Sequence, residues 1–359
     1  MTQYVLMNPG PINVSAAVRA ALNKEDLCHR ESEYFDLQDS VRRKLLDAFQ
    51  LDKKDHAAVL VTGSGTAAME AAFSSCISPA GRMLVIKNGV YGERITKICA
   101  AHGIPCDCIE AGWTERPDMD AVRSKLKTGK YEVLAAVHHE TTTGLINPVK
   151  ELAIAAREAK VPFVLDTISG LAGEELELGA NGPDMAVCTA NKCVQGLPGV
   201  GFILAKRSML ARMATFPPRT LYLHVPNYFE HQEKRSTPFT PAVQIMYALD
   251  VALDELMAET LRGRIARYKM AAKILREGFE RLGLAYLVKP EWRSNTITTL
   301  KLPSGRTYDQ LHDGLKARGY VIYAGQGPLA KEAFRVANMG LISEKDLRAF
   351  EGHLRAVIG

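Results

Sequence analysis

A single lysine, Lys192, stands just past an apolar run near the middle of the 359-residue chain, and a turn rich in glycine and proline follows it. The apolar run, residues 185–189, predicts a buried strand. Most lysines pack their hydrocarbon stem and keep the ammonium group in water, because burying an unpaired charge is costly. An amine at the end of a buried strand can also bond covalently to a carbonyl compound. The groups at the other strand ends decide between these two explanations.

A glycine-rich turn marks one of these strand ends. Residues 57–61 predict a strand, and Ser64, Gly65 and Thr66 then lead into an alanine-rich helix. Small residues let a ligand approach the backbone, and a helix N-terminus offers free N–H groups and the positive end of a dipole. The turn can therefore bind a phosphate group, although a plain strand-to-helix turn explains it equally well. It matches neither GxGxxG nor a Walker loop.

An aromatic ring and an acid follow at two further strand ends. Tyr91 lies between Gly89 and Gly92, after the strand-like residues 83–87, and can stack on a planar ligand or belong to the core. Asp166 ends another apolar run, where its carboxylate can pair with a cation or cap the next turn.

The four features form a set with one chemistry in common. Pyridoxal 5′-phosphate needs a helix N-terminus for its phosphate, a stacking face for its ring, an anion for its ring nitrogen and a lysine for its aldehyde. The chain supplies these in order, each at the end of a predicted strand. The combination is more specific than any one member and predicts that Lys192 binds this cofactor.

The elements that must position these groups alternate between strands and helices. Nearly continuous apolar strands predict a sheet covered on both faces, and their alternation with helical segments predicts a mainly parallel sheet with ligands at the carboxyl ends of its strands. The predicted strands are residues 57–61, 83–87, 133–138, 162–165, 185–189 and 200–205, and the predicted helices include 66–77 and 148–159.

The pattern of apolar and polar residues changes after about Pro241. A long helical periodicity runs to about residue 283, and strand-like runs at 294–303, 320–325 and 333–338 follow it. We predict a large α/β domain, residues 1–255, and a smaller α+β C-terminal domain, residues 256–359. The N-terminal segment 1–20 is expected to pack on the small domain.

Composition excludes several classes of protein. The net charge of +5 is mild and scattered, which argues against a nucleic-acid surface. No apolar run reaches the roughly 18 residues that a membrane span needs, and the first residues do not resemble a signal peptide. Seven cysteines without zinc spacing are typical of reduced thiols. We expect a cytoplasmic enzyme.

Six motifs make the chain resemble the class V, fold-type I aminotransferases over its whole length: "MNPGPINVS", "GSGTAAMEA", "NGVYGER", "HHETTTGLINPV", "ANKCVQGLPGVGF" and "STPFTP". Within that family it is most similar to the 2-aminoethylphosphonate–pyruvate transaminases, relatives of alanine–glyoxylate and serine–pyruvate transaminases. The resemblance implies a seven-stranded, mainly parallel sheet in the large domain, a pyridoxal phosphate cofactor and a homodimer with shared active sites.

The resemblance also implies roles for single residues. Ser64, Gly65 and Thr66 would hold the phosphate of the cofactor. Tyr91 would stack on its ring, and Thr141 would lie beside the ring hydroxyl. Asp166 would pair with the ring nitrogen, and Lys192 would bind the aldehyde. Thr237 or Thr240 would reach the cofactor phosphate of the partner subunit, and Arg335 would bind the anionic end of the substrate. Arg30 is a further substrate-binding candidate.

Other functions remain open at the level of the sequence. The resemblance implies transfer of the amino group of 2-aminoethylphosphonate to pyruvate, which gives phosphonoacetaldehyde and alanine. Related chemistry includes transamination of alanine or serine with glyoxylate, transamination of serine with pyruvate, and a lyase reaction. A binding protein without catalysis would not need both Asp166 and Lys192. His138, His139 and Glu140 could suggest a metal site, but neighbouring side chains on a strand point to opposite faces, so we predict none.

Overall fold

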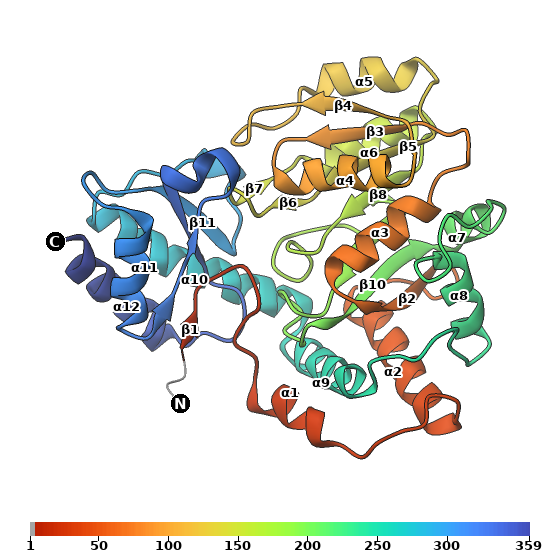
Figure 1. The fold of residues 1–359 in the computed structure, drawn as a ribbon, viewed down its shortest axis with the longest axis horizontal. Helices are drawn as coiled ribbons and strands as arrows, with labels where there is room; N and C mark the ends of the chain where they lie inside the picture. Colours follow the sequence, from red (N-terminus) through yellow and green to blue (C-terminus); the bar gives the residue numbers. More distant parts are fainter. Residues whose placement is uncertain (1–3) are drawn as a thin grey trace.

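A seven-stranded sheet forms the centre of the computed structural model, which describes residues 4–359 (Figure 1). In spatial order the strands are β2 (His56–Gly63), β10 (Gly199–Lys206), β9 (Met185–Thr189), β8 (Phe163–Asp166), β5 (Val133–Val137), β3 (Met83–Lys87) and β4 (Cys106–Glu110). Strand β10 runs antiparallel to both neighbours, and the other pairs are parallel. The predicted seven-stranded, mainly parallel sheet is confirmed.

Helices cover both faces of the sheet, as the continuous apolar strands require. On one face Met69 and Ile95 pack with Val59 and Val85 of the sheet. On the other face, alternate strand residues such as Leu84 pack against other helices. The first face carries α3 (Gly65–Ser75), α4 (Val90–Ala101), α7 (Arg207–Met213) and α8 (Val225–Glu233), and the second carries α2 (Ser32–Ala48), α9 (Val243–Glu259), α5 (Met119–Lys127) and α6 (Val149–Glu158).

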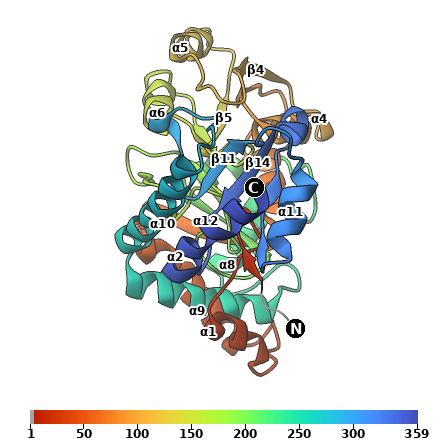
Figure 2. The same cartoon turned by 90° about the vertical axis from the view of Figure 1, so that its left-hand side faces the viewer.

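A three-stranded antiparallel sheet and three helices follow α9 (Figure 2). The strands are β11 (Ile297–Lys301), β14 (Ala333–Ala337) and β13 (Tyr323–Ala324), with β14 in the middle, and the helices are α10 (Leu261–Arg281), α11 (Tyr308–Lys316) and α12 (Glu344–Ile358). They share a core of their own, which includes Leu311, Phe334 and Phe350. This matches the predicted α+β character of the C-terminal region.

The long helical periodicity forms two helices rather than one. Helix α9 ends before Thr260, which has φ +68°, and α10 begins directly after it. The Thr260 hydroxyl accepts a hydrogen bond from the N–H of Gly263 at 3.1 Å and so caps α10. The predicted domain boundary near residue 255 lies shortly before this break and stays a prediction.

The N-terminal segment reaches the C-terminal region. Strand β1 (Val5–Leu6) pairs in parallel with β12 (Tyr320–Val321). The chain then passes through α1 (Ala16–Ala20) and the 3₁₀ turn η1 (Ala21–Asn23) under α9 (Figure 1). The first three residues of the predicted segment 1–20 lie outside the described residues. The remaining short elements are β6 (His139–Glu140), β7 (Leu145–Ile146), η2 (Pro290–Trp292) and η3 (Gly327–Lys331).

Candidate active site

Lys192 lies just after β9, at the edge of the sheet where the parallel strands end. Its ammonium group donates a hydrogen bond to the carbonyl oxygen of Pro9. Burial, with a smaller contribution from the guanidinium groups of Arg335 and Arg94, lowers the pKa of Lys192 to about 8. A lysine with such a pKa is partly neutral near physiological pH, so its amine can act as a nucleophile or a base.

Asp166 ends β8, the neighbouring strand, and only 2% of it is exposed. One carboxylate oxygen accepts a hydrogen bond from the N–H of Ile168 at 2.9 Å. Within residues 4–359, no cationic side chain lies within ion-pair distance of this carboxylate. Burial raises its pKa to about 7. A buried carboxylate without a cationic partner is suited to hold a positively charged group of a ligand.

The N-terminus of α3, which the sequence predicts to bind a phosphate, packs beside the loop that follows Asp166. Ser64 is the N-cap residue, but its side chain makes no capping bond, and the first helical hydrogen bond runs from Ala68 to Ser64 at 3.2 Å. The preceding N–H groups of the helix are therefore free for a ligand. A side chain at Gly65 would come within 2.9 Å of Ile168, so this glycine lets the turn pack against the loop that follows Asp166.

Tyr91 joins this turn through an arginine of its own helix. The guanidinium of Arg94 lies 4.5 Å from the centre of the Tyr91 ring, and Nη1 of Arg94 donates to Oγ1 of Thr66 at 3.3 Å. Arg94 also lowers the pKa values of both Asp166 and Lys192 through its charge. The aromatic ring, the phosphate turn, the acid and the lysine therefore form one site.

Thr141 connects this site to the C-terminal region. Its hydroxyl is buried and has no hydrogen-bond partner among the described residues, which fits the predicted contact with a cofactor hydroxyl. Its carbonyl oxygen accepts a hydrogen bond from Nη1 of Arg335 at 3.0 Å. A buried hydroxyl without a partner is costly, so a ligand that bonds to it gains free energy.

Arg335, on β14, is 4% exposed, and only neutral groups accept its hydrogen bonds. Its acceptors are the carbonyl of Ala324 at 2.8 Å, the carbonyl of Thr141 and the side-chain oxygen of Gln326 at 3.1 Å. In the part of the chain that the structure describes, no carboxylate pairs with it. Its positive charge therefore remains available to an anionic ligand.

Three candidate residues make no contact with the residues around Lys192 and Asp166. Arg30 is exposed and makes no side-chain hydrogen bond or ion pair with residues 4–359. Thr240 is exposed, and the hydroxyl of Thr237 donates to the carbonyl of Phe239 at 2.9 Å. The segment that contains Thr237 and Thr240 lies against the end of β2, where the N–H of Ala242 donates to the hydroxyl of Thr62 at 3.3 Å. The roles proposed for them across a dimer stay predictions.

The loop before α1 contributes two residues that the sequence reasoning missed. Pro9 accepts the hydrogen bond from Lys192, and a side chain at Gly10 would lie 2.9 Å from the lysine nitrogen. The contact joins residues 183 positions apart. Gly10 also has φ +118°, which favours glycine. Both residues lie in the motif "MNPGPINVS", for which the sequence analysis gives no role in the site.

We expect Gly10→Ala to lower kcat by about 10²-fold, because the new methyl group would displace the amine of Lys192. Gly305→Ala is a matched control, since Gly305 also has a positive φ of +73° but has open space around it. Both variants should lose thermal stability, and only Gly10→Ala should lose turnover. Steady-state kinetics and melting curves of both proteins test this. Wild-type kcat in Gly10→Ala would contradict the packing against Lys192.

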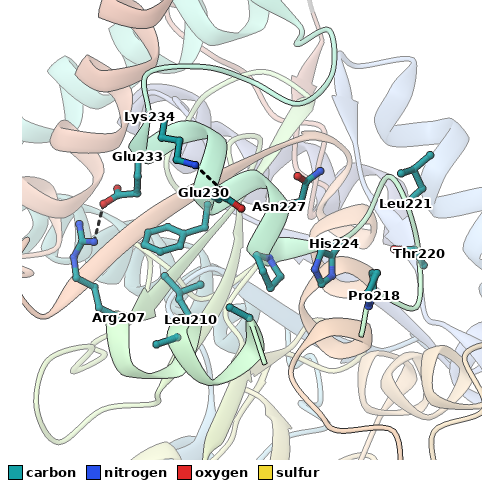
Figure 3. Close-up of a pocket in the computed structure, with 14 residues that line it drawn as sticks. Arg207, Leu210, Pro218, Thr220, Leu221, His224, Asn227, Glu230, Glu233 and Lys234 are labelled. Carbon is teal, nitrogen blue, oxygen red and sulfur yellow. Dashed lines mark hydrogen bonds and ion pairs between the residues drawn. The ribbon is translucent and has the colours of Figure 1, made fainter. Parts of the chain in front are cut away.

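A cavity of about 800 Å³ between α7 and α8 contains none of these residues (Figure 3). Its apolar wall includes Leu210 and Phe229. The charged groups at its rim are paired: Arg207 contacts Glu233 at 2.7 Å, and Lys234 contacts Glu230 at 2.6 Å. This cavity has no free charge and no reactive group for the chemistry of Lys192.

Over residues 4–359 there is also no group of three potential metal ligands and no helix that could cross a membrane.

The site and fold define the class of protein. The family model "Aminotransferase class-V" matches residues 19–336. Named 2-aminoethylphosphonate–pyruvate transaminases from Vibrio cholerae and Syntrophobacter fumaroxidans are 35% and 34% identical, over 96% of this chain and 95% and 93% of theirs. The crystal structure of alanine–glyoxylate aminotransferase from Nostoc sp. has a TM-score of 0.94 at 26% identity, and the match covers 100% of this chain and 96% of that one.

The chain therefore belongs to the class V aminotransferases. It is a pyridoxal phosphate-dependent aminotransferase, which confirms the predicted enzyme class and cofactor. The residues of the site fit this cofactor. The free N–H groups of α3 suit its phosphate, and the orphaned hydroxyl of Thr141 and the unpaired carboxylate of Asp166 suit its ring.

Proposed function

We propose that the protein transfers the amino group of 2-aminoethylphosphonate to pyruvate, giving phosphonoacetaldehyde and alanine. The observation that carries this proposal is Arg335, a buried guanidinium bound only to neutral acceptors and close enough to Lys192 to affect its pKa. Both the donor and the acceptor of this reaction carry an anionic group that such an arginine can bind. The names of the curated relatives support the same pair of substrates.

The residues of the chain divide the chemical work. Bound pyridoxal phosphate supplies the electron sink that makes the amine-bearing carbon of the donor acidic. Lys192 takes the proton from that carbon, which its lowered pKa permits. Asp166 holds the ring nitrogen in its protonated form. The N-terminus of α3 and the ring of Tyr91 fix the position of the cofactor.

Arg335 serves both halves of the reaction. Its planar guanidinium offers two parallel N–H groups to a carboxylate, and it can pair in the same way with two oxygens of a phosphonate. Its burial strengthens either contact, because water competes less in a site of low dielectric constant. One anchor can thus hold the donor first and pyruvate afterwards.

The second candidate is an amino-acid transaminase that uses glyoxylate. The similarity to the Nostoc alanine–glyoxylate aminotransferase structure favours it, and Arg335 would then bind an α-carboxylate. A panel of 2-aminoethylphosphonate and serine, each with pyruvate and with glyoxylate, and of alanine with glyoxylate, separates the two candidates. We expect the highest kcat/KM for 2-aminoethylphosphonate with pyruvate. Higher values for alanine or serine with glyoxylate would overturn the proposal.

We infer that the enzyme is a cytoplasmic homodimer, with Thr237 or Thr240 directed to the cofactor phosphate of the partner subunit. The exposure of Thr240 and its place beside the end of β2 support this inference. We also propose the division into domains 1–255 and 256–359. Light scattering gives the mass in solution, and a monomer that is fully active would contradict the shared site.

We expect Asp166→Asn to keep the cofactor bound but to slow proton removal from the donor by about 10²-fold. An amide cannot stabilise the positive charge on the ring nitrogen, so the cofactor becomes a weaker electron sink. Single-turnover rates with saturating donor measure this step. An unchanged rate would assign the role to another residue.

A further inference from the structure

Glu140, at the end of β6, is a buried carboxylate that the proposed chemistry does not use. It is fully buried, and hydrogen-bond donors surround both of its oxygens. Oε1 accepts from the N–H of Tyr91 at 3.2 Å and from the hydroxyl of Thr142 at 2.6 Å. Oε2 accepts from the N–H of Gly92 at 3.2 Å.

These contacts cap helix α4 from outside the helix. Its N-cap residue, Gly89, has no side chain to cap with, and the N–H of Val90 donates to the hydroxyl of Thr142 at 3.0 Å. The first three N–H groups of α4 are therefore all bonded to Glu140 or Thr142. A side chain at Gly89 would lie 2.3 Å from the carboxyl carbon of Glu140. The glycine and the glutamate thus fit only as a pair.

The contacts also indicate the charge of Glu140. Two backbone N–H groups and the Thr142 hydroxyl face its oxygens, and an ionised carboxylate accepts a hydrogen bond from all three. The positive end of the α4 dipole favours the same state. Burial raises the pKa of Glu140, and the hydrogen bonds from Thr142, Tyr91 and Gly92 counter that rise.

We propose that Glu140 is a positioning residue, which fixes the start of α4 and thereby the ring of Tyr91 against which the cofactor binds. Tyr91 is the second residue of α4, and its own N–H is one of the groups that Glu140 holds. Arg94, one turn further on, lies over the ring and contacts the phosphate turn at Thr66. A loosened first turn of α4 would therefore disturb both the stacking face and a cation beside the phosphate site. The inference rests on the proposed role of Tyr91.

The test is Glu140→Gln in the full-length protein, stripped of cofactor and titrated with pyridoxal 5′-phosphate by absorption. The amide turns one oxygen into a donor, which then faces the N–H of Tyr91 or of Gly92, so the cap loses one of its hydrogen bonds in either orientation. We expect the dissociation constant of the cofactor to rise about 10-fold or more, the usual effect of losing a charged hydrogen bond.

Glu132→Gln is the matched control. Glu132 also accepts from a backbone N–H and a hydroxyl, those of Ser78 at 3.2 and 2.7 Å, and it pairs with Arg212 at 2.6 Å. It precedes β5 and therefore lies at the opposite ends of the strands from Lys192. It should lower the melting temperature and leave the cofactor dissociation constant within about twofold of wild type. Equal dissociation constants in Glu140→Gln and Glu132→Gln would reduce Glu140 to a structural cap and overturn the proposal.

A milder variant keeps the test decisive if Glu140→Gln does not fold. Thr142→Val removes the hydroxyl that bonds both Glu140 and Val90, and we expect cofactor affinity to fall in the same direction. Thr142→Ser keeps the hydroxyl and should restore affinity. Unchanged affinity in Thr142→Val would refute the proposal. Wild-type protein that binds no cofactor would instead refute the proposed function, so the two failures are distinct.

Discussion

Lys192→Ala is expected to fold normally, to bind pyridoxal phosphate more weakly and to lose turnover by at least about 10³-fold. The substitution removes the covalent link to the cofactor and the base that takes the proton from the donor. Because the lysine pays a desolvation cost that lowers its pKa to about 8, its loss should not lower the melting temperature. Single-turnover kinetics with saturating donor and cofactor measure the effect.

Lys206→Ala is a matched control for this prediction. Lys206 also ends a buried strand, β10, but β10 is antiparallel, so Lys206 lies at the opposite ends of the strands from Lys192. It pairs with Asp184 at 3.0 Å. We expect it to lose some stability and to keep wild-type kcat. Turnover in Lys192→Ala above a few per cent of wild type would assign both the covalent link and the base to another group.

The central sheet could be predicted because its strands are apolar on both faces. The runs at 83–87 and 185–189 match β3 and β9 residue for residue, because short continuous apolar runs followed by turn residues are typical of strands that are buried on both faces. Strand β4 was missed for the opposite reason. It lies at the edge of the sheet, and most of its residues, such as Asp107, are partly exposed. An edge strand with polar residues resembles a loop.

The break between α9 and α10 could not be predicted from local sequence. Neither glycine nor proline stands at Thr260, and the apolar periodicity continues on both sides of it. The positive φ of this threonine is uncommon for a β-branched residue. The hydrogen bond from Gly263 maintains it, and α10 then runs from the core that it shares with α9 to the core of the C-terminal region. Tertiary contacts here override local propensity.

The site could be predicted in part, because the carboxyl ends of parallel strands meet at one edge. That rule places Asp166 and Lys192 on adjacent strand ends, as the structure does. It says nothing of Pro9, whose loop reaches the lysine from the far end of the chain. It also cannot separate a buried carboxylate that caps a helix from a metal ligand, and Glu140 is the former.

Arg335→Lys is expected to lower kcat/KM for pyruvate by about 2–4 kcal/mol in activation free energy, the range for breaking a buried charged contact. Lysine keeps the charge but loses the fork of parallel N–H groups, so neither a carboxylate nor a phosphonate is held in two places. Three neutral acceptors now orient the guanidinium, at Ala324, Thr141 and Gln326. An ammonium group cannot satisfy all three and still face a ligand. Affinity for pyridoxal phosphate should not change.

The competing explanation is that Arg335 only joins β14 to the loop at Thr141. Arg276→Lys is the control, because Arg276 is partly buried and also bonds neutral acceptors at Ser294 and Thr298. Both variants should have a lower melting temperature than the wild type, since both lose hydrogen bonds to buried acceptors. Only Arg335→Lys should raise KM for the donor and for pyruvate together, because one guanidinium serves both substrates. Unchanged KM for pyruvate would leave Arg335 with a structural role and would remove the main support for an anionic substrate at this site.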